Sequence, residues 1–320
     1  MKKGEFGFIG DIATLFGSLP HHGFEPIGDD CTVVPIGDEA LVMTTDMLVE
    51  DVHFLRGASS AQEVGQKSLY VNLSDVAAMG ATPIATLLSI ALPESAQGEW
   101  AEEFMRGYHT VAEREGVALV GGDTTASRDK ITINVVAIGR ANKQNIKRRS
   151  RAKVGDAICV TGKLGASSKG LVDIMFGDLN TQAAKAHRVA QARIKEGVWL
   201  GTRSEVHAMM DVSDGVASDL KHILNSSELG AEVELDKIPI SEELAAVCKT
   251  NGWDALSLAL EGGEDYCLLF TASTDISAEI MARTSSKIYC IGRLTDKCKD
   301  IKWIRDNEIQ ERNFRGFTHF

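Results

Sequence analysis

The sequence predicts a mixed α/β (α+β) protein with two domains, and three observations lead to that prediction. The chain has 320 residues, 44% of them hydrophobic, which is enough to bury more than one core. Strand-like apolar runs alternate with longer segments of helical period in both halves. Between the halves, the polar segment RANKQNIKRRSRAKVGD has no hydrophobic period. We therefore expect one domain at residues 1–145 and a second at residues 146–320.

The first half predicts a starting helix followed by one α/β unit. The opening MKKGEFGFIGDIATLF is interrupted by Glu5 and Asp11 and lacks a small-residue cleavage site, so it indicates a helix and not an export signal. The next apolar periods predict helices at Ser60–Met79 and Ala96–Glu115 and strands at Ala40–Thr45, Ile84–Leu92, Val117–Val120 and Ile131–Ile138.

The second half restarts the same alternation after the polar connection. It predicts helices at Leu164–Phe176 and near Ala186–Leu200. Shorter apolar runs predict a strand that ends at Asp211 and further strands at Ala157–Thr161, Glu232–Leu235, Tyr266–Thr271, Lys287–Ile291 and Ile301–Arg305.

Composition excludes several classes of protein. A net charge of −11 argues against nucleic acid as the main partner, because a phosphate backbone needs a basic surface. No stretch approaches the roughly 20 apolar residues of a membrane-spanning helix, so we expect no membrane partner and a cytoplasmic protein. The six cysteines form no CxxC pair, which favours neither a zinc site nor a secreted disulfide framework.

One basic run, Lys147 to Lys153, stands out in this acidic chain. It is either a solvated connector between the domains or a clamp for a phosphate group, and the sequence leaves both open.

Short acidic motifs carry most of the functional information. Most of them put a carboxylate beside glycine or a hydroxyl residue where a strand ends and the backbone turns. If they converge, the carboxylates repel one another unless cations hold them together, and hard divalent metals prefer such oxygen ligands. The motifs are GDDC at Gly28–Cys31, TTD at Thr44–Asp46, NLSD ending at Asp75, GGDTT at Gly121–Thr125, DVSDG at Asp211–Gly215 and GGED at Gly262–Asp265.

Several of these residues have an ordinary structural alternative. Asp30 lies in PIGDDC, which is also a typical turn sequence. Thr44 and Thr45 precede Asp46, so their oxygens could face one site with the carboxylate, or a threonine could cap a helix. Asp75 differs, because an ionised acid within the apolar helical stretch SLYVNLSDVAAMG is costly unless it is paired or metal-bound.

The acids next to glycine also have both a functional and an ordinary structural interpretation. Asp123 follows two glycines, which permit close approach of the backbone to a phosphate, but a hairpin turn is the usual reason for GGD. Asp211 and Asp214 flank Ser213 before a helix, and capping explains only one of the two acids. There is no GxxxxGK[ST] loop, kinase signature, GxSxG elbow or HExxH pair, so any ATP is held in another way.

Taken in chain order, these motifs resemble those of thiamine-monophosphate kinases. That family belongs to the superfamily of aminoimidazole ribonucleotide synthetase, selenophosphate synthetase and the hydrogenase-maturation carbamoyl dehydratase. The resemblance runs from FGFIGDI at Phe6–Ile12 to the closing GFTHF, and it includes TTDMLVEDVHF, the RSxAKxGD pattern of Arg149–Asp156, TGxLG and GGEDY. Arg151 departs from it, since this pattern usually has glycine there.

The resemblance implies ATP-dependent phosphorylation of thiamine monophosphate to thiamine diphosphate, with several magnesium ions. The implied metal ligands are Asp30, Thr44, Thr45, Asp46, Asp75, Asp123, Asp211 and Asp214. The residues implied to lie against the nucleotide are Gly122, Asp123, Arg149 and Ser213. Those implied to contact thiamine monophosphate are His53, Glu264 and Phe317. The residues implied to support catalysis directly are Asp75, Asp123, Asp211 and Arg149.

The family also implies a synthetase-like fold and a homodimer, in which the sheet of the first domain pairs with its twin to form a barrel-like interface. The chemistry is consistent, because the acceptor is a phosphate monoester that is already anionic and needs little general-base help. Two alternatives remain: another phosphate-activating enzyme of the superfamily, such as an aminoimidazole ribonucleotide synthetase, and a non-catalytic nucleotide-binding protein. Retention of all the acidic motifs counts against the second.

Two of the implied substrate residues can also be judged from their chemistry. His53 precedes an aromatic residue, and histidines of that kind are often simply packed and hydrogen-bonded. Phe317 is an aromatic residue near the carboxy terminus, where there is little core for it to join, which favours a role in binding.

Overall fold

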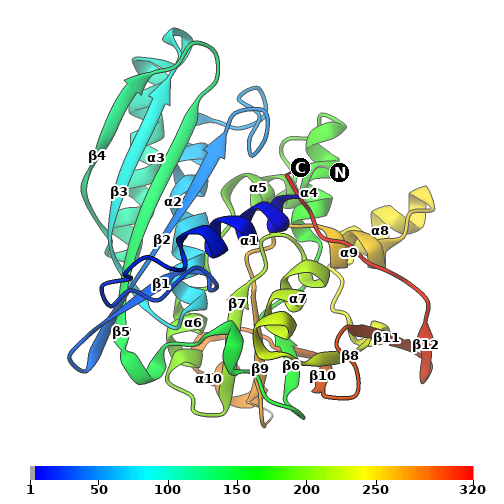
Figure 1. Cartoon of the computed structure of the whole chain (residues 1–320). Helices are drawn as coiled ribbons and strands as arrows, with labels where there is room; N and C mark the ends of the chain where they lie inside the picture. The colour runs from blue at the N-terminus through cyan, green and yellow to red at the C-terminus, as the bar shows by residue number, and fades with distance from the viewer. Residues whose placement is uncertain (1–3, 275, 320) are drawn as a thin grey trace.

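The computed structural model describes residues 4–274 and 276–319, and it arranges them around two β-sheets (Figure 1). The first sheet has five strands in the order β1-β2-β5-β3-β4, and its neighbours are antiparallel except for the parallel pair β3 and β4. The elements of this half are α1 (Glu5–Phe16), β1 (Thr32–Ile36), β2 (Glu39–Val49), α2 (Ala61–Ala78), β3 (Thr82–Leu92), α3 (Glu99–Glu115), β4 (Ala118–Ala126) and β5 (Thr132–Asn142).

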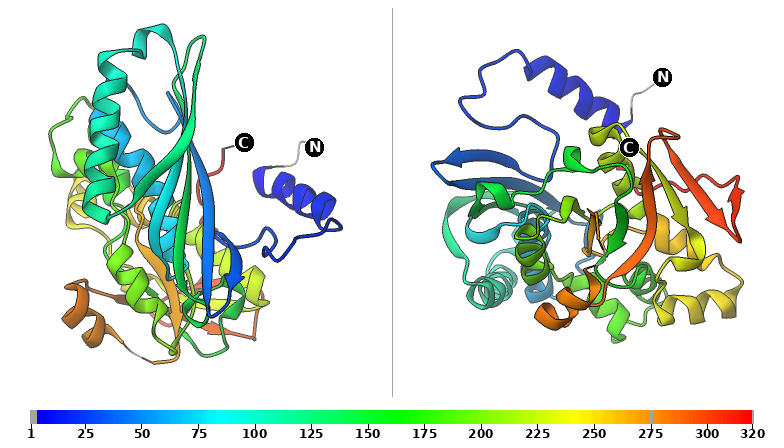
Figure 2. Two further views of the ribbon diagram at one scale, coloured as in Figure 1. Left: turned by 90° about the vertical axis from the view of Figure 1, so that its left-hand side faces the viewer. Right: turned by 90° about the horizontal axis from the view of Figure 1, so that it is seen from below.

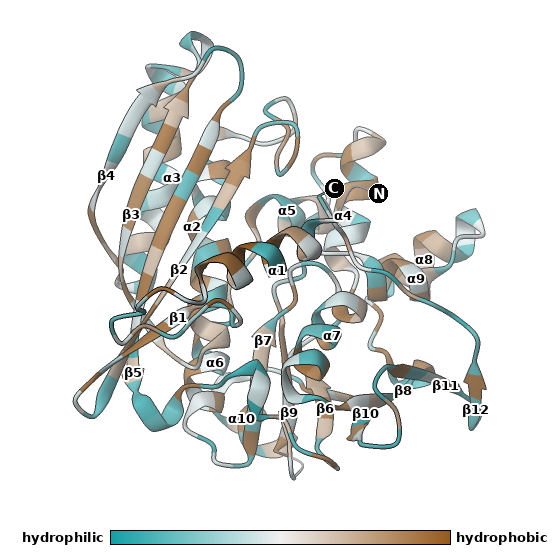
Figure 3. Ribbon diagram, viewed as in Figure 1, coloured by the Kyte–Doolittle hydropathy of each residue, from teal (hydrophilic) through white to brown (hydrophobic). Residues whose placement is uncertain are grey.

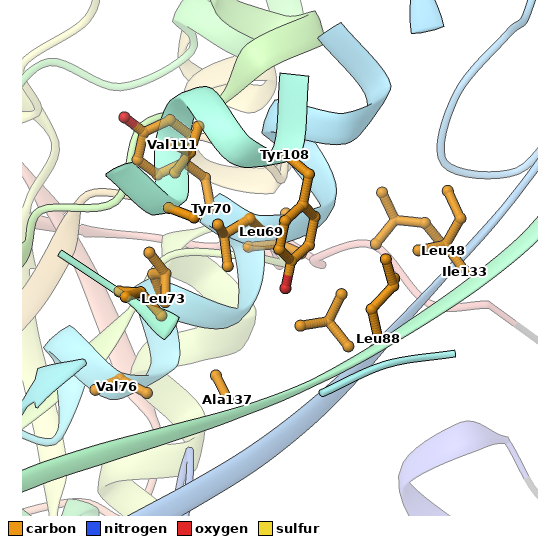
Figure 4. Packing of buried hydrophobic residues seen from close by; sticks show 14 of the residues in the cluster. Leu48, Leu69, Tyr70, Leu73, Val76, Leu88, Tyr108, Val111, Ile133 and Ala137 are labelled. Carbon is orange, nitrogen blue, oxygen red and sulfur yellow. The ribbon is translucent and has the colours of Figure 1, made fainter. Parts of the chain in front are cut away.

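Helices α2 and α3 cover one face of the five-stranded sheet. Ser60 begins α2 with a capping box, in which its hydroxyl accepts from the Glu63 N–H and the Glu63 carboxylate accepts from the Ser60 N–H. The two helices and the strands enclose one apolar core, to which α2 contributes Leu69 and Leu73 (Figure 4). Since α2 is buried along most of its length, polar side chains on it can be retained only if they have partners.

The other face of this sheet is not covered by a packed helix. Figure 2 shows α2 and α3 on one side of the sheet and α1 on the other side, standing away from it, and no residue of α1 is buried. Outward-facing positions such as Met43 and Val136 are only partly buried, while their strand neighbours Val42 and Val135 lie in the core. Figure 3 shows hydrophobic residues along α1 and on the strands of this sheet.

The second sheet has seven strands in the order β12-β11-β8-β10-β6-β9-β7. Only β8 and β11 pair in parallel. The elements of this half are β6 (Ala157–Val160), α4 (Ala166–Met175), α5 (Gln182–Val189), α6 (Ile194–Gly201), β7 (Val206–Asp211), α7 (Val216–Ser227), β8 (Gly230–Glu234), α8 (Glu242–Asn251), α9 (Ala255–Glu261), β9 (Leu268–Ala272), α10 (Ser277–Thr284), β10 (Tyr289–Thr295), β11 (Ile301–Arg305) and β12 (Glu308–Gln310).

Helix α2 joins the two halves. One side of it packs against β2, β5 and α3, and another side packs against α5, α6 and β7. Residues on α2 therefore contact both sheets, which decides where the site lies. None of the helices within residues 4–274 and 276–319 combines the length and apolar character needed to cross a membrane.

Several predicted elements have different bounds. Strand β2 continues past Thr45 to Val49, so Asp46 lies within it. Strand β4 includes the whole GGDTT motif, which is therefore neither a hairpin turn nor a strand end. The helix predicted near Ala186–Leu200 is divided into α5 and α6, because the backbone turns at Ala190, where φ is 37°. Strands β1 and β12 and helices α8 to α10 lie outside the elements that the sequence predicted.

One disulfide bond joins β6 to β10. Cys159 and Cys290 face each other directly in the antiparallel ladder, with their Cα atoms 4.1 Å apart. They are separated by 131 residues in sequence, so their spacing gave no sign of the pair. The other four cysteines, all within the described residues, are free.

Candidate active site

Three acids from distant segments meet at the junction of the two halves. Carboxylate oxygens of Asp30, Asp75 and Asp211 all lie within 4.8 Å of one another. Asp30 precedes β1, Asp75 lies on α2 and Asp211 ends β7. The structure therefore brings three of the predicted metal ligands together.

Asp75 is fixed within the cluster by β2. The Thr44 hydroxyl donates to Asp75 Oδ2 over 2.6 Å, as expected if Thr44 points toward α2. Burial raises the pKa of Asp75 well above its usual value, and the nearby carboxylates of Asp46 and Asp211 raise it further. Such a carboxyl group must bind either a proton or a cation.

The pKa values of Asp211 and Asp46 are also raised by burial and by neighbouring acids. Ser74 Oγ donates to Asp211 Oδ2 over 2.6 Å, yet burial, together with the Asp30 carboxylate, raises the pKa of Asp211 to about 8. Burial likewise raises the pKa of Asp46 to about 6, with Asp214 as the next cause. Neighbouring acids therefore hold their charges only at a large electrostatic cost.

Arg149 places a positively charged side chain beside this acid cluster. Its guanidinium group pairs with Asp30, and its backbone N–H donates to Asp29 Oδ1 over 2.7 Å. Among the described residues, two buried atoms of this pair, Asp30 Oδ2 and Arg149 Nε, have no hydrogen-bond partner. An unpartnered buried carboxylate oxygen among hard oxygen donors suits a divalent cation of the magnesium type.

The DVSDG loop carries a further acid, Asp214. Burial raises the pKa of Asp214 to about 6. The carbonyl of Ser213 accepts from the Glu264 N–H over 2.8 Å, and the carbonyl of Asp214 accepts from the Phe317 N–H over 2.9 Å. One loop therefore holds both the GGED segment and the carboxy-terminal tail against the acids.

Two predicted ligands do not join the cluster within this chain. Thr45 is exposed on β2, and because side chains alternate along a strand it faces away from Thr44; its hydroxyl accepts from Asn134 Nδ2 over 2.8 Å. Asp123 is exposed on β4, which lies at the edge of the sheet opposite to β1, three places from β2. Gly122 beside it has φ of 153°, and a Cβ there would lie 1.8 Å from Leu88 O.

A cavity of about 1110 Å³ extends from the acids to a second group of predicted residues. Both halves of the chain contribute to its walls. The predicted site residues that line it are Asp46, His53, Asp75, Asp211, Ser213, Asp214, Glu264 and Phe317.

His53 lies in the turn after β2. The N–H of Val49 donates to His53 Nδ1 over 3.0 Å, so in the neutral ring the proton is on Nε2. Burial, followed by the neighbouring His319, lowers the pKa of His53 and favours this neutral form. The ring is thus a hydrogen-bond donor through Nε2.

Glu264 has an unusual backbone and two side-chain partners. Its φ is 63°, in the left-handed region that non-glycine residues seldom adopt. Lys67 Nζ lies 2.6 Å from Glu264 Oε1, and His187 Nδ1 lies 3.4 Å from Oε2. Burial alone would raise the pKa of Glu264, but the Lys67 ammonium group outweighs it and holds the pKa below its usual value. Glu264 therefore remains an anion.

Phe317 is 51% exposed, and its ring meets that of His319 edge-on at 5.0 Å between centroids. The tail is held at its other side by Glu5, whose Oε2 accepts from the His319 N–H over 2.8 Å. Segments near both ends of the chain therefore reach the pocket, since Glu5 and His319 both line it. In Figure 1, the start of α1 and the carboxy-terminal segment lie near each other. The aromatic face is available to a ligand.

The basic run is not a solvated connector. Lys147 is buried and donates to Arg203 O over 2.7 Å, and burial lowers its pKa to about 8. Arg148 binds Glu25, while Arg149 reaches the acid cluster. Arg151 is exposed in a short 3-10 helix with an ordinary negative φ, so the usual glycine is not required there.

Sequence reasoning missed several polar residues around the pocket. Lys67 and Asn72 are buried on α2, His187 lies on α5, and Asp219 is a buried acid on α7. Asn72 stands in the apolar stretch that singled out Asp75, and Lys67 directly precedes it, so the cost of burying them was the signal that could have found them.

The fold and its acid-lined cavity define a class of two-domain proteins. Family models of AIR synthase related proteins match the chain, the N-terminal domain at residues 28–141 and the C-terminal domain at residues 153–303. Within that class, the chain belongs to the thiamine-monophosphate kinase family. This rests on relatives that share more than 30% of their residues over almost their whole length.

Three relatives illustrate the match. The thiamine-monophosphate kinase of Buchnera aphidicola from Acyrthosiphon pisum is 37% identical, with 100% of both chains covered. That of Escherichia coli K12 is 35% identical over 92% of this chain and 91% of its own. A solved structure described as AaThiL complexed with AMPPCP and TMP has a TM-score of 0.85 and 32% identity, and covers 100% of this chain and 99% of its own.

Proposed function

We propose that this protein transfers the terminal phosphoryl group of ATP to the phosphate of thiamine monophosphate, forming thiamine diphosphate. The observation that carries the proposal is the continuity of one cavity from the acid cluster to the pocket of His53, Glu264 and Phe317. A polyphosphate can lie at the first end while a cationic heteroaromatic ring lies at the second. We place the reaction in the cytoplasm, where ATP and magnesium are available.

The acids would hold several magnesium ions, as their raised pKa values and the unpartnered Asp30 oxygen favour. The residues assigned to them in this chain are Asp30, Thr44, Asp46, Asp75, Asp211 and Asp214. When bound, the ions neutralise phosphate charge and align donor and acceptor. Thr45 stays a proposed ligand that the strand geometry does not favour.

The chain's own residues orient the substrates. His53 Nε2–H can donate to the acceptor phosphate, because Nδ1 already accepts from Val49. Arg149 can bind phosphate oxygens of the nucleotide beside Ser213, since its Nε has no partner among the described residues. No side chain is needed as a nucleophile, because the acceptor phosphate is itself anionic. Transfer is therefore direct.

The vitamin end is recognised by charge and stacking. The ionised Glu264 carboxylate faces a cavity that would hold the positive charge of the thiazolium ring. Phe317 offers an exposed aromatic face to the same space. These two residues separate this substrate from acceptors without a cationic ring.

We further propose a homodimer formed through the outer face of the five-stranded sheet. That face carries partly exposed apolar residues such as Met43 and Val136, and β4 is exposed along its whole length. In a dimer, Gly122 and Asp123 can serve the nucleotide site of the other copy, which would explain why they lie apart from the acids here. We keep the domain division at residues 1–145 and 146–320.

The dimer can be tested by mixing two inactive variants. Asp75→Asn and Asp123→Asn homodimers, unfolded and refolded together, should regain about a quarter of wild-type activity if each site combines both chains. No recovery, with mixed dimers present, would show that both acids act in one chain.

The decisive experiment supplies purified protein with ATP, magnesium and thiamine monophosphate and measures thiamine diphosphate directly. ADP release with other phosphate acceptors separates this activity from that of another superfamily member. If the protein binds ATP but neither releases ADP nor forms thiamine diphosphate, the proposal fails in favour of a nucleotide-binding protein.

A further inference from the structure

Lys67 is a buried cation that none of the sequence motifs assigned a role. Its side chain is 2% exposed and lies on α2, which also carries Asp75. Burying an ammonium group is costly unless partners compensate it. Two partners do so, because Lys67 Nζ lies 2.6 Å from Glu264 Oε1 and donates to the His53 carbonyl over 2.9 Å.

These two partners come from different halves of the chain, and both line the cavity. His53 follows β2 in the first half, and Glu264 lies between α9 and β9 in the second half. Both are substrate residues in the proposed function. The ammonium group of Lys67 therefore contacts both His53 and Glu264.

The backbone conformation of Glu264 makes its ion pair with Lys67 important for the position of the carboxylate. Its left-handed backbone, with φ of 63°, carries strain that surrounding contacts must hold. The backbone N–H is held by Ser213 O over 2.8 Å, and Lys67 pairs with Oε1 of the side chain, while His187 Nδ1 lies 3.4 Å from Oε2. Without Lys67, the carboxylate would lose its strongest partner and could turn out of the cavity.

We propose that Lys67 is a positioning residue, which holds the His53 turn and the Glu264 carboxylate in register so that both can grip one acceptor molecule. The inference rests on the proposed function. Lys67 acts through its partners, since its ammonium group is almost completely covered. A merely structural lysine would lower stability without any preference for one ligand.

The test compares Lys67→Met with Lys237→Met in the full-length protein. Lys237 forms a surface pair with Glu234 over 2.8 Å and is 55% exposed, so its loss controls for removal of one positive charge. Titration calorimetry measures the Kd of thiamine monophosphate and, separately, of a non-hydrolysable ATP analogue. Steady-state assays give KM and kcat.

For Lys67→Met we expect thiamine monophosphate binding to weaken by about tenfold or more, because a buried charge pair is broken. The ATP-analogue Kd should change by less than about twofold, and KM for thiamine monophosphate should rise with its Kd. Lys237→Met should match wild type. If Lys67→Met binds thiamine monophosphate as wild type does, or loses both ligands equally, the inference is wrong while the function stands. If wild type itself does not bind thiamine monophosphate, the proposed function and this inference both fail.

A second pair of variants covers the case in which Lys67→Met does not fold. Glu264→Gln removes the charge that Lys67→Met would leave unpaired. The double variant, with both changes, is therefore compared with the single variant Glu264→Gln. In this background the ion pair with Glu264 is already lost, so the added change removes only the hydrogen bond to the His53 carbonyl and should weaken thiamine monophosphate binding by at most about threefold. A further tenfold loss would show that Lys67 acts independently of Glu264 and would overturn the inference.

Discussion

Single carboxylates in this protein illustrate how burial and function are linked. Asp75 has one hydrogen-bond donor, Thr44, but lies beside Asp30 and Asp211 in a site where burial favours the neutral form. A protein that needed Asp75 only for packing would be more stable with an uncharged residue there. Its retention as an acid is best explained by cation binding.

Asp75→Asn should lower turnover by at least about 100-fold at ordinary magnesium concentrations, because it removes one charge from the metal-binding set. The fold should persist, since asparagine can still accept from Thr44. Thermal unfolding with and without magnesium provides the second readout, and the stabilisation by magnesium should shrink. Near wild-type rates in the purified variant would remove Asp75 from the metal site.

Phe317→Ala should weaken binding of thiamine monophosphate by several-fold to some tens of fold. Stacking of an aromatic ring on a cationic ring contributes about 0.5–2 kcal/mol, which sets that range. ATP affinity should barely change, because Phe317 contacts the DVSDG loop through its backbone N–H, which the substitution leaves in place, and only the ring is removed. Each ligand is titrated separately into the variant. Equal loss of both affinities, with a lower Tm, would mean that the tail is only structural.

At the level of elements, the position of α2 depends on close packing against α3. A Cβ on Gly65 would lie 2.1 Å from Phe104 O, which is backbone and cannot move aside. The same helix carries Lys67 and Asp75, which line the cavity. The spacing between α2 and α3 therefore also sets the position of the site.

Gly65→Ala should destabilise the protein by about 1–3 kcal/mol, because the helices must separate to admit the methyl group. Gly10→Ala is the matched control: Gly10 also lies in a helix, α1, but nothing is within 4 Å of its Cβ position. There alanine should stabilise the helix by about 0.5–1 kcal/mol. Urea unfolding of both variants measures the difference, and equal effects would contradict the packing argument.

For the whole molecule, the acid cluster couples stability to pH and to metal. In the absence of metal, burial raises the pKa of Asp211 to about 8 and that of Asp75 well above its usual value. The folded protein therefore binds protons that the unfolded chain, with carboxyl pKa values near 4, has already released. Stability must fall as pH rises from about 4 toward 8, because across this range the unfolded chain has released protons that the folded state still holds.

We expect the Tm of chelator-treated protein to be lower at about pH 8 than at about pH 6.5, and magnesium to raise Tm more at pH 8. The window lies above most of the range in which opposing groups act: the buried His187 and His222 have pKa values lowered to about 4 from about 6.5, and Lys147 acts with opposite sign only above about pH 8. Asp211→Asn should raise the metal-free Tm at pH 8 and reduce its pH dependence. A metal-free Tm that rises from pH 6.5 to 8 would contradict this account.

Local patterns were enough to predict much of this protein. The helix at Ser60–Met79 and the strand at Ile84–Leu92 follow from apolar periods that the sheet and helices then satisfy. The cost of placing an acid in the apolar stretch around Asp75 is visible in the sequence alone, and it pointed to a functional site. The order of the acidic motifs predicted the family, which the comparisons confirm.

Only the tertiary structure decided which residues meet. The sequence could not show that Lys67 reaches both His53 and Glu264, because that contact depends on how α2 fits between two sheets. Nor could it show that Asp123 lies on an edge strand away from the acids, since strand order is set by long-range pairing. Spacing along the chain determines the character of each segment, whereas distances between segments arise when the whole core packs.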